Sequence, residues 1–216
     1  MAIHKDFPKS PYVILSPDIR WFPADESLRD TSYKKLMPPL VPELRKAVAK
    51  WRADGYPDIS NTSKTLLNHW FNKKHPINQT DGTTSDFQYY FAQREAVETV
   101  IYLHETIRVA DKYDLLRFSS SDAVSPQLFE ETWRRYVVKM ATGSGKTKAM
   151  SLILAWSYFH KKYEEGSDLS KNFLIIAPNI IVLDRLRNDF DGLKIFSEDP
   201  VIPEDGIGGK NWKTDF

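Results

Sequence analysis

The chain has 216 residues, 41% hydrophobic and 27% charged, a globular composition that excludes a wholly disordered or collagen-like protein. Thirty basic and 29 acidic residues leave a net charge of +1, so no global attraction to nucleic acid is expected. The absence of cysteine excludes disulfides and favours a reducing, cytoplasmic location. No apolar run approaches the roughly 18 residues of a membrane span, so no membrane partner is expected.

Residues 1–80 are expected to form a mainly helical accessory region. From Val41 to Trp51, apolar residues recur at helical spacing, with Pro42 near the start and Gly55 beyond the end. A second helix is expected to begin with Thr62 or Ser63 as its cap. Its apolar face would carry Leu66, Leu67, Trp70 and Phe71.

The segment 72–86 is rich in Pro, Gly, Asn and Thr, which predicts a loop or domain linker before a second domain over residues 81–216. A long helix is expected from about Tyr90 to Ala110, followed by a short helical piece over 129–133. The chain therefore divides into a helical region and a domain of different character.

The second domain shows the element order strand, helix, strand, helix. Residues 135–140 and 172–177 have strand composition, and helical patterns follow over 147–163 and through Leu183, Leu186 and Phe190. This order predicts an α/β fold with parallel strands and a right-handed crossover. Such a sheet needs more strands than are found, so we expect an incomplete domain.

The most specific motif is MATGSGKT, residues 140–147, between the predicted strand and helix. Glycines at 143 and 145 allow the backbone amides to turn inward around a phosphate, at the positive end of the helix. Lys146 would neutralise phosphate oxygens and the Thr147 hydroxyl would coordinate Mg²⁺. Thr142 and Ser144 complete the loop, which predicts ATP and Mg²⁺ as cofactors. The general pattern has Gly where Met140 stands.

Several segments together resemble superfamily 2 helicases and translocases, in particular the Res subunits of type III restriction enzymes. The likeness lies in FQYYFAQREAVETVIYLHE, the phosphate loop KMATGSGKT and LIIAPNIIVLDRLRNDF, which appear in the family's order as a Q-like segment, motif I and motif Ia. RWFPADE and LLNHWF near the N-terminus are also similar to Res-like proteins. The resemblance implies a RecA-like P-loop NTPase domain, ATP-dependent translocation on DNA and a role in phage defence.

By this resemblance, Gln93 reads the adenine edge of ATP, and Pro178 and Asn179 of motif Ia hold the DNA backbone. From the residues alone, Gln93 is equally a solvated side chain on an amphipathic helix, and Pro178 a strand stop. Charges at 184, 185 and 187 are most simply solvated. Aromatic and basic residues over 70–75 suit either a core face or a strand-binding patch.

The resemblance also shows what this sequence lacks. No DExH-like motif follows motif Ia before Phe216, and no second RecA-like domain or nuclease domain is identified. We therefore expect an N-terminal part of a DNA-dependent ATPase, which binds ATP but hydrolyses it negligibly alone, with DNA and a methyltransferase or specificity subunit as partners. The alternative is a non-catalytic nucleotide-binding or interaction module in which ATP is a structural or regulatory ligand.

Overall fold

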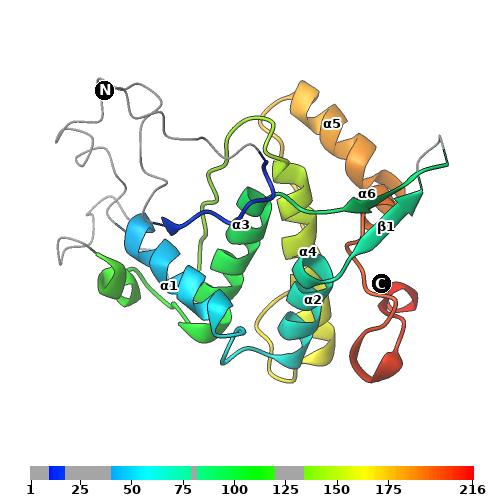
Figure 1. The fold of residues 1–216 in the computed structure, drawn as a ribbon. Coiled ribbons are helices and arrows are strands. Elements are labelled where there is room, and N and C mark those ends of the chain that lie inside the picture. The colour runs from blue at the N-terminus through cyan, green and yellow to red at the C-terminus, as the bar shows by residue number, and fades with distance from the viewer. Residues whose placement is uncertain (1–9, 18–39, 79–81, 120–133) are drawn as a thin grey trace, which may run out of the picture. The chain divides into compact units, whose positions relative to one another are not determined.

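The computed structural model describes residues 10–17, 40–78, 82–119 and 134–216 (Figure 1). The chain forms two compact units, and each is assembled from separate stretches of sequence. Unit 1 comprises residues 1–12, 59–97 and 140–216, and unit 2 comprises residues 13–58 and 98–139. The RWFPADE segment and the helical piece expected over 129–133 lie outside the described residues. The domain boundary expected near residue 80 stays a prediction.

In unit 2, helix α1 (Val41–Ala53) confirms the first predicted helix. Its buried face carries Val48 and Trp51, and the Trp51 indole donates a hydrogen bond to the Pro57 carbonyl at 2.9 Å. Helix α3 (Phe91–Ile101) begins in unit 1 and ends in unit 2, where it continues as a π-helical turn, η4 (Tyr102–Thr106). This confirms most of the long helix expected from Tyr90.

A buried carboxylate organises unit 2. Glu98 on α3 has no exposed surface and accepts from the Arg52 guanidinium at 2.8 Å and from the Tyr56 hydroxyl at 2.6 Å. These charged and neutral donors compensate the cost of removing the carboxylate from water. The ion pair therefore joins α1 to α3 through two residues that are 46 positions apart in sequence.

In unit 1, helix α2 (Asn61–Asn72) begins two or three residues earlier than expected, because Ser60 is its cap. The Ser60 hydroxyl accepts from the Ser63 amide at 3.1 Å, so Thr62 and Ser63 lie in the first turn. Burial of Leu66 and Leu67 confirms the predicted apolar face.

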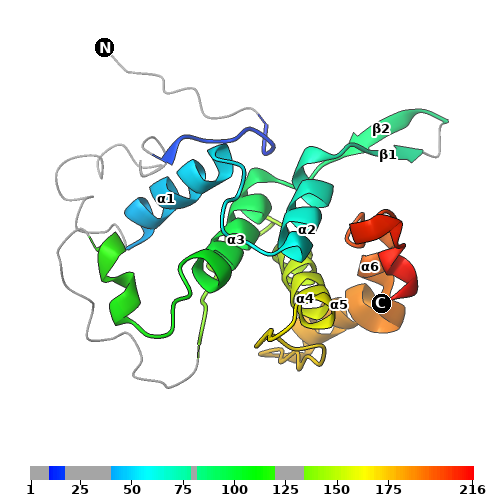
Figure 2. The same ribbon diagram turned by 90° about the horizontal axis from the view of Figure 1, so that it is seen from below.

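The core of unit 1 forms where α2 lies beside α4 (Lys146–Tyr163), as Figures 1 and 2 show. The Trp156 indole of α4 donates to the Ser63 hydroxyl at 2.8 Å. The Trp70 indole of α2 donates to the Val201 carbonyl at 2.7 Å, and Trp212 stacks on Phe159 with ring centres 4.7 Å apart. The segment after residue 198 thus supplies core residues without long helices.

Shorter helices complete the described chain, and none of its helices is long and apolar enough to cross a bilayer. Helix α5 (Ile180–Phe190) confirms the helical pattern through Leu183. The remaining elements are η5 (Tyr113–Phe118), η6 (Asp191–Leu193), α6 (Lys194–Glu198), η7 (Ile207–Gly209) and η8 (Trp212–Thr214).

The linker expected over residues 72–86 is a β-hairpin in part, so that prediction is wrong. Strands β1 (His75–Asn78) and β2 (Thr84–Phe87) pair antiparallel, with His75 opposite Phe87. Gly82 has a φ of +82°. The Pro, Gly and Asn residues that suggest a loop are also those that connect and border short strands, so composition did not separate the two structures.

The predicted parallel sheet is absent from the described residues, where β1 and β2 form the sheet that is present. Residues 135–140 and 172–177 have irregular backbone and no strand assignment. Several of their apolar side chains are exposed, with Val137 at 87%, Leu174 at 85% and Ile176 at 81%. A strand is stabilised by hydrogen bonds to a neighbour and by a packed face, and the described part of the chain supplies neither to these segments.

Candidate nucleotide-binding site

The phosphate loop adopts the backbone conformation that its glycines were expected to allow. Gly143 has a φ of +78° and Gly145 a φ of +76°, both in the left-handed region. Gly145 is the N-cap of α4, and its carbonyl accepts the Ala149 amide at 3.2 Å, as the first bond of the helix. The loop therefore ends at the N-terminus of α4, a helix of 18 residues. The unpaired amides and the dipole of a helix N-terminus favour an anion.

Polar side chains of the loop bond the carbonyls of the loop itself. Lys146 is exposed, and its amine donates to the carbonyls of Met140 at 3.1 Å and Ala141 at 2.9 Å. The Ser144 hydroxyl donates to the Ala141 carbonyl at 2.7 Å, while Thr142 is exposed in the turn. Thr147 is half-buried in the first turn of α4. Two carbonyls of the loop therefore hold the Lys146 amine over it.

Gln93 lies beside the phosphate loop, but its amide is engaged by protein groups. Its Oε1 accepts the Tyr90 amide at 2.8 Å, and its Nε2 donates to the carbonyls of Ser144 at 3.1 Å and Gly145 at 3.4 Å. The side chain is 2% exposed, which excludes the solvated interpretation. The structure thus brings the Q-like segment and motif I together through one residue.

Close packing explains why glycine is needed at position 145. A Cβ there would lie 2.0 Å from Gln93 Nε2, far inside contact distance, and the positive φ disfavours any side chain. A Cβ at Gly143 would meet nothing within 4 Å, so only its backbone conformation requires glycine. One glycine therefore serves a turn and the other a close approach.

The motif Ia residues lie at the start of α5. Asn179 is the N-cap, and its side-chain oxygen accepts the Val182 amide at 3.0 Å. Asn179 and Pro178 are exposed, and so are the charged residues at 184, 185 and 187. Figure 1 shows α4 and α5 beginning toward the same end of the drawing. The cooperation of the two motifs stays a prediction.

The strand-binding alternative for residues 70–75 has little support. Trp70 is a core residue, Lys73 pairs with Asp205, and Lys74 lies 3.8 Å from Asp86. Within the described ranges, no group of three or more His, Asp or Glu residues is arranged to hold a metal ion. Sequence reasoning missed one contact near the loop: Lys148 pairs with Asp199 and lies over the Phe87 ring.

A family model described as the Res subunit of type III restriction enzymes matches residues 86–214, a stretch that contains Gln93, the phosphate loop and Asn179. The chain belongs to this family. The Res family lies within the helicase-like ATPases, has a RecA-like P-loop fold and acts on DNA. No curated protein and no solved structure matches the chain.

Proposed function

We propose that this chain is the ATP-binding part of a DNA-dependent Res-like ATPase. The observation that carries the proposal is the phosphate loop, in which two left-handed glycines lead directly into α4. Backbone amides from Gly143 to Thr147 would surround the β-phosphate, and Lys146 would neutralise β and γ oxygens. These groups fit a nucleoside triphosphate because they combine a helix N-terminus, a cation and a hydroxyl.

Mg²⁺ would be held by the Thr147 hydroxyl together with nucleotide oxygens and water, since Mg²⁺ prefers oxygen ligands and keeps several waters. When bound, it would offset negative charge on the phosphates. The chain's own contribution is to position the groups that meet the nucleotide. Helix α4 orients the backbone amides, and Thr147 supplies its hydroxyl oxygen. Gln93 holds the loop backbone through the Ser144 carbonyl.

We infer a positioning role for Gln93. In the described conformation its oxygen and nitrogen both have protein partners, so reading adenine would require it to give up at least one of them. Adenine recognition by Gln93 therefore stays a prediction that competes with loop positioning. The contacts of Asn179 support a role in forming α5, and a role of Asn179 and Pro178 in holding DNA phosphates is likewise a proposal.

Hydrolysis by these 216 residues is expected to be negligible, because no DExH-like motif occurs among them to orient metal and water. A methyltransferase partner and a cytoplasmic location also remain predictions. The module alternative, with ATP as a structural or regulatory ligand, predicts the same binding. Robust, DNA-stimulated hydrolysis that disappears in Lys146→Ala would contradict the expectation of an inactive fragment.

Calorimetric titration with Mg·ATP tests the proposal. Lys146→Ala removes an exposed ammonium and leaves the backbone nest, so ATP affinity should fall at least about tenfold while the circular dichroism spectrum is unchanged. Lys171→Ala, which removes an exposed ammonium outside the loop, is the matched control. Equal ATP affinity in wild type and Lys146→Ala would reject the site.

A further inference from the structure

A strip of apolar side chains is exposed on unit 1 between the end of α4 and the first turn of α5. Its members are all large and lie close together in sequence: Phe173, Leu174, Ile176, Ile180 and Ile181. No charged residue occurs from Asn172 to Leu183. Contiguous exposed apolar surface on a folded protein marks an interaction site.

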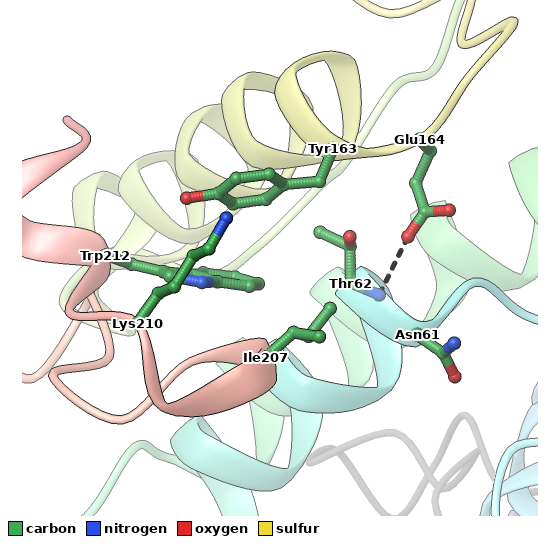
Figure 3. A pocket seen from close by; sticks show the side chains of 7 residues that line it. All are labelled: Asn61, Thr62, Tyr163, Glu164, Ile207, Lys210 and Trp212. Atoms are coloured by element: carbon green, nitrogen blue, oxygen red, sulfur yellow. Dashed lines mark hydrogen bonds between the residues drawn. The ribbon is translucent and has the colours of Figure 1, made fainter.

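The strip is separate from the cavity of unit 1. That cavity has a volume of about 270 Å³ and lies at the C-terminal end of α4, where Tyr163 and Glu164 line it (Figure 3). None of the exposed residues of the strip lines it. A partner of the strip therefore binds on the surface of the protein.

The backbone of residues 173–177 also offers unused hydrogen-bonding groups. None of its N–H or C=O groups forms a hydrogen bond with another described residue. Leu174 and Ile176 are exposed while Ile175 and Ala177 are half-buried, which is the alternation of a strand with one side toward solvent. No residue of the segment has a positive φ, so its backbone can extend without strain. An unpaired strand edge is a template for pairing with another chain.

The side chains of the segment match those of a second copy in antiparallel register. In a pair centred on Ile175, Leu174 of each copy lies opposite Ile176 of the other. Phe173 then lies opposite Ala177, a large side chain against a small one. Since residues 174 and 176 are exposed on the same side of the segment, those of both copies come together on one face.

Charge also favours a second copy as the partner. In the same register, Lys171 of one copy lies opposite Asn179 of the other, so no like charges meet. The net charge of +1 adds little repulsion between whole molecules near neutral pH. Residues 172–177 are uncharged, rich in β-branched side chains and free of proline, which is typical of identical strands that pair with each other. Pro178 limits the pair to this length.

We propose that residues 172–177 pair with the same residues of a second copy of this chain, as antiparallel strands related by a two-fold axis. The backbone groups bond across the pair, and the same surface serves both copies. Two segments of this length form a small interface, and interfaces below about 1,200 Å² are typically weak. The dissociation constant should therefore lie between about 1 µM and 1 mM.

Sedimentation velocity over a range of protein concentrations tests the pairing. Leu174→Lys places a charge in the pair, so it should raise the dissociation constant at least about tenfold. Its thermal stability should be unchanged, because this side chain is 85% exposed. Val137→Lys makes the same change at an apolar residue that is 87% exposed outside the segment, and it should associate as wild type does. Lys146→Ala should also associate normally, which separates this proposal from the nucleotide site.

Disulfide trapping tests the register, since the chain has no cysteine of its own. Directly opposite residues have Cα atoms about 4.5–5.5 Å apart, within reach of a disulfide, whereas diagonal residues at about 7–8 Å are too distant. An equimolar mixture of Leu174→Cys and Ile176→Cys should therefore form a disulfide-linked dimer under mild oxidation, and neither variant alone should do so efficiently.

Four results would overturn the proposal. They are a wild-type protein that stays monomeric up to about 1 mM, undiminished association of Leu174→Lys, equal cross-linking of either cysteine variant alone, and growth past a dimer into fibres. The first two would reject the segment as an interface between copies, and the last two would reject its closed, two-fold pairing.

Discussion

Replacing Gln93 by alanine tests how the Q-like segment acts on the phosphate loop. The substitution removes hydrogen bonds of 2.8 Å to the Tyr90 amide and 3.1 Å to the Ser144 carbonyl. Each is worth about 0.5–1.5 kcal/mol. The side chain is 2% exposed, and the Cγ methylene that alanine lacks adds about 0.8 kcal/mol. The free energy of unfolding should therefore fall by about 2–4 kcal/mol.

The effect on nucleotides distinguishes loop positioning from base reading. Because Gln93 bonds the loop backbone in the described conformation, Gln93→Ala should weaken ATP and GTP by the same factor, about tenfold. Gln93→Glu keeps an acceptor for Tyr90 but sets a carboxylate oxygen against the Ser144 carbonyl, so it should also weaken both nucleotides. Gln88, an exposed glutamine nearby, provides the control Gln88→Ala.

Competition titrations with ATP and GTP, combined with urea denaturation, measure both quantities. The positioning role would be refuted if Gln93→Ala reduced affinity for ATP much more than affinity for GTP. That result would mean that the glutamine leaves the loop when nucleotide binds and reads adenine. An unchanged free energy of unfolding in Gln93→Ala would contradict the hydrogen bonds of Gln93 to Tyr90 and Ser144.

Three further predictions concern stability and DNA. Burial, with the nearby charges of His75 and Lys73, lowers the pKa of His69 to about 4. As the pH falls, His69 of the unfolded chain, with a pKa near 6.5, binds a proton before His69 of the folded protein does. The free energy of unfolding should therefore fall by up to about 3 kcal/mol between pH 6.5 and 4. Denaturation at several pH values should show this loss, and His69→Leu should reduce it. Glu98→Ala removes the buried carboxylate that binds the Arg52 guanidinium and should cost about 3–5 kcal/mol in thermal denaturation. Glu43→Ala, at a carboxylate whose side chain is 45% exposed, should change stability by less than about 0.5 kcal/mol, and equal effects would contradict the role of burial. Asn179→Asp keeps the acceptor that caps α5 and adds a negative charge that repels DNA phosphates. DNA affinity, measured by fluorescence anisotropy, should therefore fall while the fold stays intact. Unchanged affinity would remove Asn179 from the DNA site.

Local sequence patterns predicted the helices and the phosphate loop well. The helix from Val41 follows from the spacing of apolar residues, and the turn at Gly143 and Gly145 follows from what glycine backbone permits. These features depend on residues within a few positions of each other. Even here the cap of α2 was placed at Thr62 or Ser63 rather than Ser60, since all three are good caps.

Features that depend on distant partners were predicted less well. Residues 135–140 and 172–177 have strand composition, but a strand also needs a neighbour, which the described residues do not provide. The hairpin over residues 75–87 was missed because its strands are short. Gln93 bonds the carbonyls of Ser144 and Gly145, which lie about 50 residues away, so spacing alone left its role open between a solvated and a binding side chain.

The most direct test of ATP binding at the phosphate loop is NMR observation of its backbone amides. On addition of Mg·ATP to the ¹⁵N-labelled protein, the amide signals of Gly143, Gly145 and Lys146 should shift together with one dissociation constant. In Lys146→Ala the same signals should need at least about ten times more ATP to shift. Loop amide signals that stay unchanged at saturating ATP, while other signals shift, would contradict the proposed function.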